Sequence, residues 1–234
     1  MRLGVLETGS PPSALQARFG DYPAMFRALL GEDFWWRTYD VQNGPLPGSP
    51  EDEDAYIVTG ASAGVYDGDP WIGRLMEFLR GARGRSRLVG ICFGHQAMAQ
   101  AFGGQVIKSP RGWGVGLHTY RVLEHAPWMD AAETIAIPAS HQDQVVELPP
   151  QARILAASAF SPFGMLDYGQ DAISLQLHPG FEPAFAEALL EDRRGTRIED
   201  DQAEAAVASL HRPNDNVRVG DWLKRFLSGQ PGSG

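Results

Sequence analysis

The sequence has little of what marks exported or membrane-bound proteins. Cys92 is the only cysteine among 234 residues, so no disulfide can form within the chain and nothing in it requires an oxidising compartment. No run approaches the roughly 18 apolar residues of a membrane span, and the acidic Glu7 comes before an apolar signal-peptide region could develop. We therefore expect a cytoplasmic protein with no membrane partner.

Positive charge is also scarce. The chain has 20 Lys and Arg against 29 Asp and Glu, which gives a formal net charge of −9 at pH 7. This balance argues against a surface built to neutralise phosphates, although a local basic patch is compatible with it. We expect no nucleic-acid partner.

The common phosphate-binding and metal-binding motifs are absent as well. No Gly-x-x-x-x-Gly-Lys-Ser/Thr run occurs, and the glycines between Gly112 and Gly116 do not follow a strand that opens into a helix. The histidines and acids show no ligand spacing such as His-Glu-x-x-His. We expect neither a metal nor a cofactor.

What the sequence does contain is typical of one α/β domain. Short apolar runs alternate with helical patterns in the first half, which predicts βαβ units around a mostly parallel sheet with helices on its faces. Shorter runs with turn signals follow and predict hairpins that then return to the sheet. The expected strands span residues 3–6, 35–39, 55–58, 88–91, 116–123, 134–137, 154–158, 163–167 and 173–177. The expected helices span residues 22–30, 71–79, 182–192, 200–210 and 217–227. We expect a single domain over residues 1–228 and a flexible tail over 229–234.

The strongest chemical signal is the segment around Cys92. Gly90 and Gly94 flank this cysteine where a strand pattern gives way to a helix pattern. A sharp strand-to-helix turn strains its central residue and needs small neighbours two positions away, which is the nucleophile-elbow arrangement with Cys in place of Ser. The helix N-terminus would lower the pKa of the thiol, and the N–H of Phe93 would face a developing oxyanion. The alternative is a buried cysteine that packs as a small hydrophobic residue.

A thiol nucleophile needs a base, and His178 is the histidine best placed to be one. It follows an apolar run and precedes Pro179, which predicts a position at the carboxyl end of a strand, on the same sheet edge as Cys92. A structural or surface role for this histidine is the alternative.

Four segments in order resemble the class I glutamine amidotransferases, particularly stand-alone members with a flavodoxin-like fold. They read TGASAGVYD at 59–67, GICFGHQ at 90–96, SHQDQV at 140–145 and LQLHP at 175–179. The resemblance covers most of the chain and implies an α/β, flavodoxin-like fold. It also implies a Cys-His-Glu triad that hydrolyses the γ-amide of glutamine or a γ-glutamyl bond through a thioester.

The resemblance assigns roles to individual residues. Cys92 would be the nucleophile and His178 the general base that reprotonates the leaving amine. The substrate-binding residues would be Gly60 and Phe93 at the oxyanion hole, Ala61 beside Gly60, Gln96 on the glutamyl group, and His141 on a loop that borders the pocket. For His141, an imidazole bonded to its own backbone is an equal alternative.

One departure from the family pattern concerns the third triad member. The family has His-Pro-Glu, whereas this chain has Gly180 at the third position and its next acid at Glu182. Glu182 could reach back, another acid could substitute, or the protein could be a weakened enzyme, because losing the orienting carboxylate of a serine hydrolase costs up to about 10⁴ in rate. Glu182 before Pro183 also fits a plain acid at a helix N-terminus.

Two classes of function follow. The first is a cysteine hydrolase, either a glutaminase that passes ammonia to a separate synthetase subunit or a free-standing γ-glutamyl peptidase. The second is a binding or regulatory protein that kept the fold and lost turnover, because function depends on the site and not on the fold.

Overall fold

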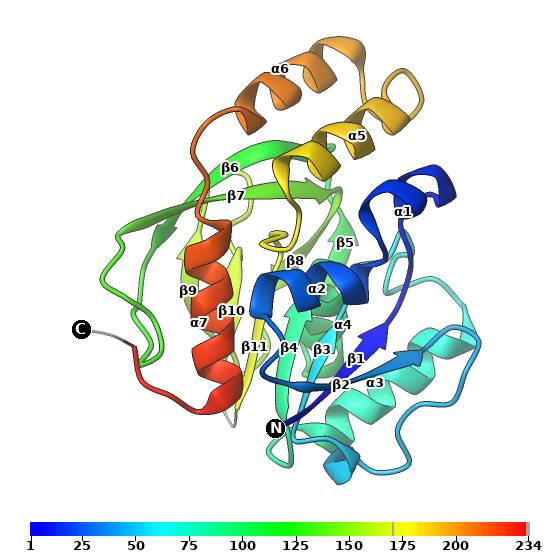
Figure 1. Ribbon diagram of the computed structural model, residues 1–234, viewed down its shortest axis with the longest axis vertical. Helices are drawn as coiled ribbons and strands as arrows, with labels where there is room; N and C mark the ends of the chain where they lie inside the picture. The colour runs from blue at the N-terminus through cyan, green and yellow to red at the C-terminus, as the bar shows by residue number, and fades with distance from the viewer. Residues whose placement is uncertain (170, 233–234) are drawn as a thin grey trace.

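The computed structural model describes residues 1–169 and 171–232, and its centre is a nine-stranded mixed sheet (Figure 1). Strands lie in the order β2-β1-β3-β4-β11-β10-β9-β6-β7. The parallel strands are β2 (Trp35–Asp40), β1 (Arg2–Glu7), β3 (Ala55–Val58), β4 (Arg87–Ile91) and β11 (Ala172–Leu175). The antiparallel strands are β10 (Met165–Asp167), β9 (Arg153–Ala157), β6 (Gly114–Val122) and β7 (Thr134–His141).

The α/β fold is confirmed. The five parallel strands have the flavodoxin-like order. β2 lies on one side of β1, and β3, β4 and β11 follow in sequence on its other side. The antiparallel half is larger than a mostly parallel sheet with added hairpins, because β10, β9, β6 and β7 all continue the same sheet beyond β11. The parallel half brings the carboxyl ends of β3, β4 and β11 to one edge.

Helices cover both faces of the sheet, as expected. They are α1 (Ser13–Phe19), α2 (Tyr22–Leu30), α3 (Pro70–Ala82), α4 (Phe93–Ala101), α5 (Pro183–Arg193), α6 (Asp200–Leu210) and α7 (Asn216–Ser228), with a short 3-10 turn η1 (Pro50–Asp52). Alternate residues of the parallel strands point to opposite faces. Ile57 and Val89 pack with α2 and α7, whereas Val58 and Leu88 pack with α3 and α4. Helices α1, α5 and α6 pack together with Val115 and Leu117 of β6 in a third apolar cluster (Figure 1).

The segment expected as a loop at 140–145 is instead a corner between two strands. β7 runs to His141, and after Gln142 the chain enters β8 (Asp143–Glu147), which pairs with β5 (Gln105–Lys108) in a small second sheet. The polar letters of this segment resemble a loop, but its backbone groups are used by strand pairing. The expectation of a loop was wrong. Strand pairing with β6 and β5 holds the backbone of this wall of the site.

The end of the chain continues past α7 against the body of the protein. The N–H of Gln230 donates to the carbonyl of Arg225 at 2.9 Å, and the N–H of Gly232 donates to that of Pro127 at 2.5 Å. Residues 233–234 of the expected tail lie outside the described residues. That residues 1–228 form one domain stays a prediction. Among the described residues, no helix combines the length and the apolar character needed to cross a bilayer.

Candidate active site

Cys92 lies at a strained turn between β4 and α4. Its φ of 53° and ψ of −102° fall in a region that ordinary side chains rarely adopt, at a cost of about 1–3 kcal/mol. The turn is held from both sides, because the N–H of Cys92 donates to the carbonyl of Leu175 at 2.8 Å and its own carbonyl accepts from Gln96 N–H at 3.0 Å. Strain that the surrounding structure maintains at one residue is typical of a functional position.

The flanking glycines are required by close packing. A Cβ on Gly94 would lie closer than 3.0 Å to the carbonyl oxygen of Val58 on the neighbouring strand, and a Cβ on Gly90 would lie 2.5 Å from the carbonyl oxygen of Gly94. The sequence expectation of a tight elbow therefore has a specific cause, namely that α4 begins in contact with β3 and β4.

His178 reaches the same place from the end of β11. β11 pairs with β4 in parallel, so Leu175 lies opposite Ile91, and the chain then continues three residues to His178. Its N–H donates to the carbonyl of Pro138 at 2.9 Å, and its ring stacks on Phe181 with 3.9 Å between centroids. These contacts fix the position of the imidazole.

Gly60, which follows β3, lies between the two candidate catalytic residues. A Cβ built on Gly60 would lie 3.4 Å from Cε1 of His178 and 3.7 Å from Cβ of Cys92. The carboxyl ends of three adjacent parallel strands, β3, β4 and β11, therefore bring a glycine, a cysteine and a histidine to the wall of one cavity.

Burial disfavours the charged form of both groups. Desolvation raises the pKa of Cys92 to about 12, although the charge of Arg193 and the N–H of Phe93 act in the opposite direction. Desolvation also lowers the pKa of His178 to about 3, and the neighbouring His141 adds to this. The N–H of Phe93 at the start of α4 thus lowers the pKa of the thiol in the expected direction, but burial outweighs it.

Two cavities meet at Cys92. The first has a volume of about 570 Å³ and the second about 410 Å³. Gln96 and His141 line the first, and Gly60 and His178 line the second. The residues that line both are Ala61, Ser62, Cys92, Ser140, Arg193 and Arg197. A substrate whose reactive bond lies at the sulfur can therefore extend in two directions.

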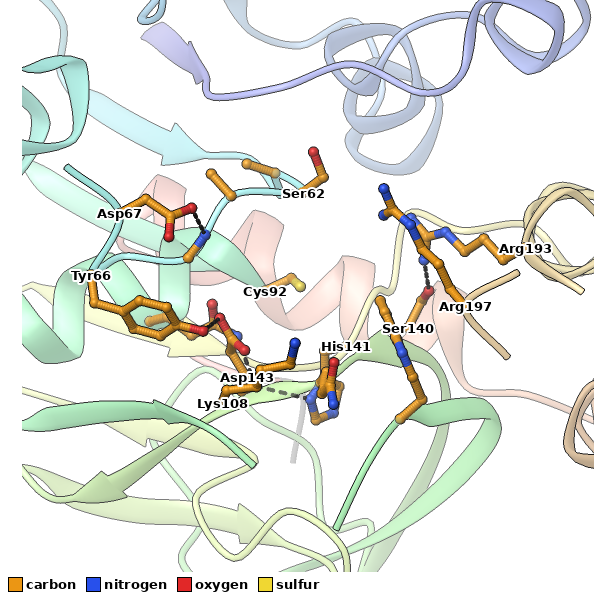
Figure 2. A pocket seen from close by; sticks show the side chains of 16 residues that line it. Ser62, Tyr66, Asp67, Cys92, Lys108, Ser140, His141, Asp143, Arg193 and Arg197 are labelled. Carbon is orange, nitrogen blue, oxygen red and sulfur yellow. Dashed lines mark hydrogen bonds between the residues drawn. The ribbon is translucent and has the colours of Figure 1, made fainter. Parts of the chain in front are cut away.

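The first cavity has a polar wall that is organised by hydrogen bonds. The Nε2 of Gln96 donates to the carbonyl of Asp143 at 2.9 Å, and Nδ1 of His141 lies 3.2 Å from the same oxygen. The hydroxyl of Tyr66 donates to the Asp143 carboxylate at 2.9 Å. Figure 2 shows Tyr66, Asp143 and Lys108 together on one side of Cys92. Burial raises the pKa of Asp143, while Lys108 favours its charged form.

On the other side of Cys92, Figure 2 shows Arg193 and Arg197 together. Arg193 ends α5, donates from Nη1 to Ser140 Oγ at 2.7 Å and places its guanidinium over the Trp113 ring, 5.4 Å from its centroid. Arg197 is exposed at the mouth of both cavities. Desolvation lowers the pKa of Arg193, and the charge of Arg197 lowers it further. The pair makes one end of the site cationic.

The structure does not bring Glu182 to the site. Glu182 is exposed at the N-terminus of α5 and lines a separate pocket with Phe19 and Phe185. Gly180 borders a small cavity of about 10 Å³ beside His178, lined otherwise by apolar and aromatic side chains and the backbone of Gly60. Among the described residues that line this cavity there is no carboxylate. Nε2 of His178 has no hydrogen-bond partner within the described part of the chain.

The sequence-predicted residues and the observed site overlap in most positions. Of the eight residues named from the sequence, six line one cavity or both, namely Cys92, His178, Gly60, Ala61, Gln96 and His141. Phe93 is buried directly after the cysteine, and Glu182 lies elsewhere. Sequence reasoning missed Lys108, Asp143, Arg193 and Arg197 as wall residues. No local pattern marked the two arginines, because the helix expected at 182–192 ends before both of them.

No metal cluster is present among the described residues, since no three His, Cys, Asp or Glu side chains come together as ligands there.

Taken together, the parallel sheet half, the cysteine elbow and the histidine at the next strand end define an α/β protein with a cysteine nucleophile-elbow site. Residues 40–193 match the family described as "Glutamine amidotransferase class-I", and the chain belongs to that family.

Relatives match over nearly the whole chain. A glutamine amidotransferase-like protein of Schizosaccharomyces pombe is 28% identical over 243 residues, covering 96% of this chain and 98% of the relative. Gamma-glutamyl peptidase 5 of Arabidopsis thaliana is 26% identical over 241 residues, covering 98% and 96%. The crystal structure of a glutamine amidotransferase from Thermotoga maritima has a TM-score of 0.78 and covers 97% of this chain and 99% of that one. It is 16% identical, so it supports the fold alone.

Proposed function

We propose that the protein is a cysteine hydrolase that cleaves γ-glutamyl amide bonds through a thioester on Cys92. The observation that carries the proposal is that Gly60, Cys92 and His178 line one cavity, with the space beside the Gly60 Cα bordered by both other residues, and that Cys92 lies where two cavities meet. A nucleophile, a base and backbone donors at one point are the parts that acyl transfer requires. The full-length similarity to a γ-glutamyl peptidase supports the same reaction.

The proposed reaction proceeds in two halves. As Sγ of Cys92 attacks the γ-carbonyl carbon, its proton passes to His178, and the N–H groups near Gly60 and Phe93 stabilise the oxyanion. The carbon–nitrogen bond breaks, and the amine leaves with the proton from His178. Water then gives a proton to His178 and attacks the thioester, which releases glutamate and restores the thiol. Because both groups start uncharged, the proton moves during attack and not before it.

We assign the glutamyl group to the first cavity. Its α-ammonium would pair with Asp143, and its α-carboxylate would lie near Lys108, since both side chains line that cavity. Gln96, His141 and Ala61 would shape the remaining wall. The buried, uncharged His141 would act as a hydrogen-bonding group, because burial lowers its pKa to about 3.

The missing carboxylate does not leave His178 unoriented. In this proposal the Phe181 ring and the Ser140 backbone position the imidazole, in place of a triad glutamate. Glu182 would then serve as an acid at the start of α5 and take no part in the reaction. This arrangement would support a slower enzyme than one with a carboxylate.

A second candidate function is a ligand-binding protein without turnover. The buried His178 Nε2 without a partner and the uncharged thiol favour this alternative. In a third version the protein is a glutaminase whose ammonia passes to a separate synthetase subunit, and turnover of glutamine would then depend on that partner.

The test is release of glutamate from γ-glutamylglycine and from L-glutamine. We expect turnover of the dipeptide by the native protein and loss of at least about 10³-fold in Cys92→Ala, because the nucleophile is removed. Circular dichroism and the melting temperature of the variant provide the folding control. No turnover of either compound by the folded native protein would contradict the proposal and favour either a binding protein or a glutaminase that is silent without its synthetase. Turnover of glutamine alone would favour the glutaminase.

A further inference from the structure

If the proposed hydrolysis holds, the position of His178 determines which of the two cavities holds the leaving group. A general acid must lie within hydrogen-bond reach of the amine that it protonates. His178 lines the second cavity and is not among the residues that line the first. The amine that departs, together with whatever it carries, therefore lies in the second cavity.

The size of the second cavity does not match ammonia. Its volume is about 410 Å³, whereas a molecule as small as water needs only about 30 Å³. The wall of this cavity comes from the residues before α1, from Tyr22 and from the turn after α5, at Thr196 and Arg197. It has room for a substituent of amino-acid size or larger.

The charges on this wall select an anion. Arg193 and Arg197, which also line the first cavity, are its two cations, and Asp192, which is exposed, is the one carboxylate among the described residues that line it. The remaining titratable lining groups are Tyr22, Cys92 and His178, all uncharged near neutral pH. Arg193 has donors beyond the Nη1 that bonds Ser140, and within the described part of the chain Arg197 forms no salt bridge that would compete with a ligand. Two guanidinium groups at one end of a cavity bind a carboxylate well, because each presents paired N–H donors.

We propose that the second cavity is a leaving-group subsite for an amine that bears a carboxylate, and that Arg193 and Arg197 bind that carboxylate. The substrate class is then γ-glutamyl amino acids and short γ-glutamyl peptides, in preference to glutamine or to neutral γ-glutamyl amides. Arg193 is the anchored member of the pair, since Ser140 and Trp113 hold it, and Arg197 closes on the carboxylate from the rim.

The test compares two ligands that share the glutamyl group. γ-Glutamylglycine has a carboxylate on its leaving group, and γ-glutamylethylamide has none. Dissociation constants are measured by titration calorimetry with Cys92→Ala, which removes turnover, and again with Arg197→Gln added. We expect γ-glutamylglycine to bind about tenfold tighter than the ethylamide, and Arg197→Gln to remove most of that ratio by weakening the dipeptide alone.

Two further variants make the comparison specific. Arg194 pairs with Glu191 and lines neither cavity, so Arg194→Gln should leave the ratio unchanged. Asp143→Asn should weaken both ligands equally, because it would act on the glutamyl group. Equal affinity of the two ligands, equal weakening of both by Arg197→Gln, or no binding of either would overturn the subsite. A preserved ratio without turnover by the native protein would instead overturn the hydrolysis and leave the carboxylate subsite standing.

Discussion

At the scale of single residues, the proposed chemistry depends on the conformation of Cys92, on what orients His178 and on which side chain stands at position 180. Cys92 adopts its strained conformation because Leu175 and Gln96 hold it on both sides. The histidine that faces it is oriented by an aromatic ring, where the family pattern has a carboxylate two residues later. The substitution of Gly180 for that carboxylate is therefore the residue-level feature most directly tied to rate.

Gly180→Glu should raise the turnover of γ-glutamylglycine. A Cβ at Gly180 would meet Met25 and Phe26 at an ordinary 3.9 Å, and the backbone there is one that any residue adopts. The new carboxylate is larger than the cavity of about 10 Å³ beside His178, so Met25 and Phe26 must shift for it to enter there and stabilise the imidazolium that forms during attack. We expect a gain in kcat of about tenfold or more, within the roughly 10⁴-fold range that an orienting carboxylate supplies in a serine hydrolase.

Gly180→Gln is the matched control, since it adds the same volume without the charge. Steady-state assays measure kcat for γ-glutamylglycine with both variants at equal concentrations of folded protein. An equal gain in the two variants would assign the effect to packing, and no gain in Gly180→Glu would show that the ring contact with Phe181 already orients the imidazole fully.

Sequence reasoning located the residues that belong to local patterns and missed those that do not. Cys92 and its glycines form a contiguous motif, and His178 follows an apolar run, so both could be found. Arg193, Asp143 and Lys108 come from a helix end and two short strands that only the folded chain brings together. The charge state of Cys92 could not be read either, because burial decides it.

At the scale of elements, the elbow is a contact between helix α4 and strands β3 and β4. Gly94→Ala should destabilise the fold by about 2 kcal/mol or more, because its Cβ would press on the backbone carbonyl of Val58, which cannot move without shifting β3. It should also lower activity by displacing the start of α4. Urea denaturation monitored by tryptophan fluorescence measures the change.

Gly73→Ala serves as the comparison for the same chemical change. Gly73 lies in the exposed face of α3, and a Cβ there would meet nothing within 4 Å. This substitution should stabilise the protein by roughly 0.5–1 kcal/mol, since alanine is favoured over glycine within a helix. Destabilisation of similar size in both variants would contradict the argument from close packing.

Elements with clear periodicity were predicted well, and short polar ones were not. The expected helices at 22–30 and 200–210 coincide with α2 and α6. β5 and β8 have four and five residues, and their pairing is visible only in three dimensions. Helix α1 was also missed. It follows Pro11 and Pro12, and it has one buried residue, Leu15, so its apolar face is too narrow to read from the sequence.

At the scale of the whole molecule, buried histidines make stability depend on pH. Desolvation lowers the pKa values of His95, His141 and His178 to about 3. Their ordinary pKa is near 6.5, so the unfolded chain takes up protons below pH 6.5 while the folded chain does not. Stability is therefore retained above pH 6.5 and is lost progressively as the pH falls from 6.5 towards 3.

We expect the urea midpoint to fall between pH 7 and pH 5, a range above most carboxyl titrations. The loss should be roughly 1–2 kcal/mol for each of the three histidines by pH 5. His95 forms a hydrogen bond with Ser174 and lines neither cavity. His95→Gln should therefore reduce the drop in urea midpoint between pH 7 and pH 5 without changing a residue of the site. A midpoint that is the same at pH 7 and pH 5 would contradict this account.

The second cavity also bears on how the protein could have diversified. Its wall includes Ser10 to Ser13, Tyr22, Thr196 and Arg197, all outside the 40–193 region that matches the family. The nucleophile and the histidine come from the sheet within that region. Selection could therefore exchange one preferred leaving group for another through segments that lie before and after that region, without changing Cys92 or His178.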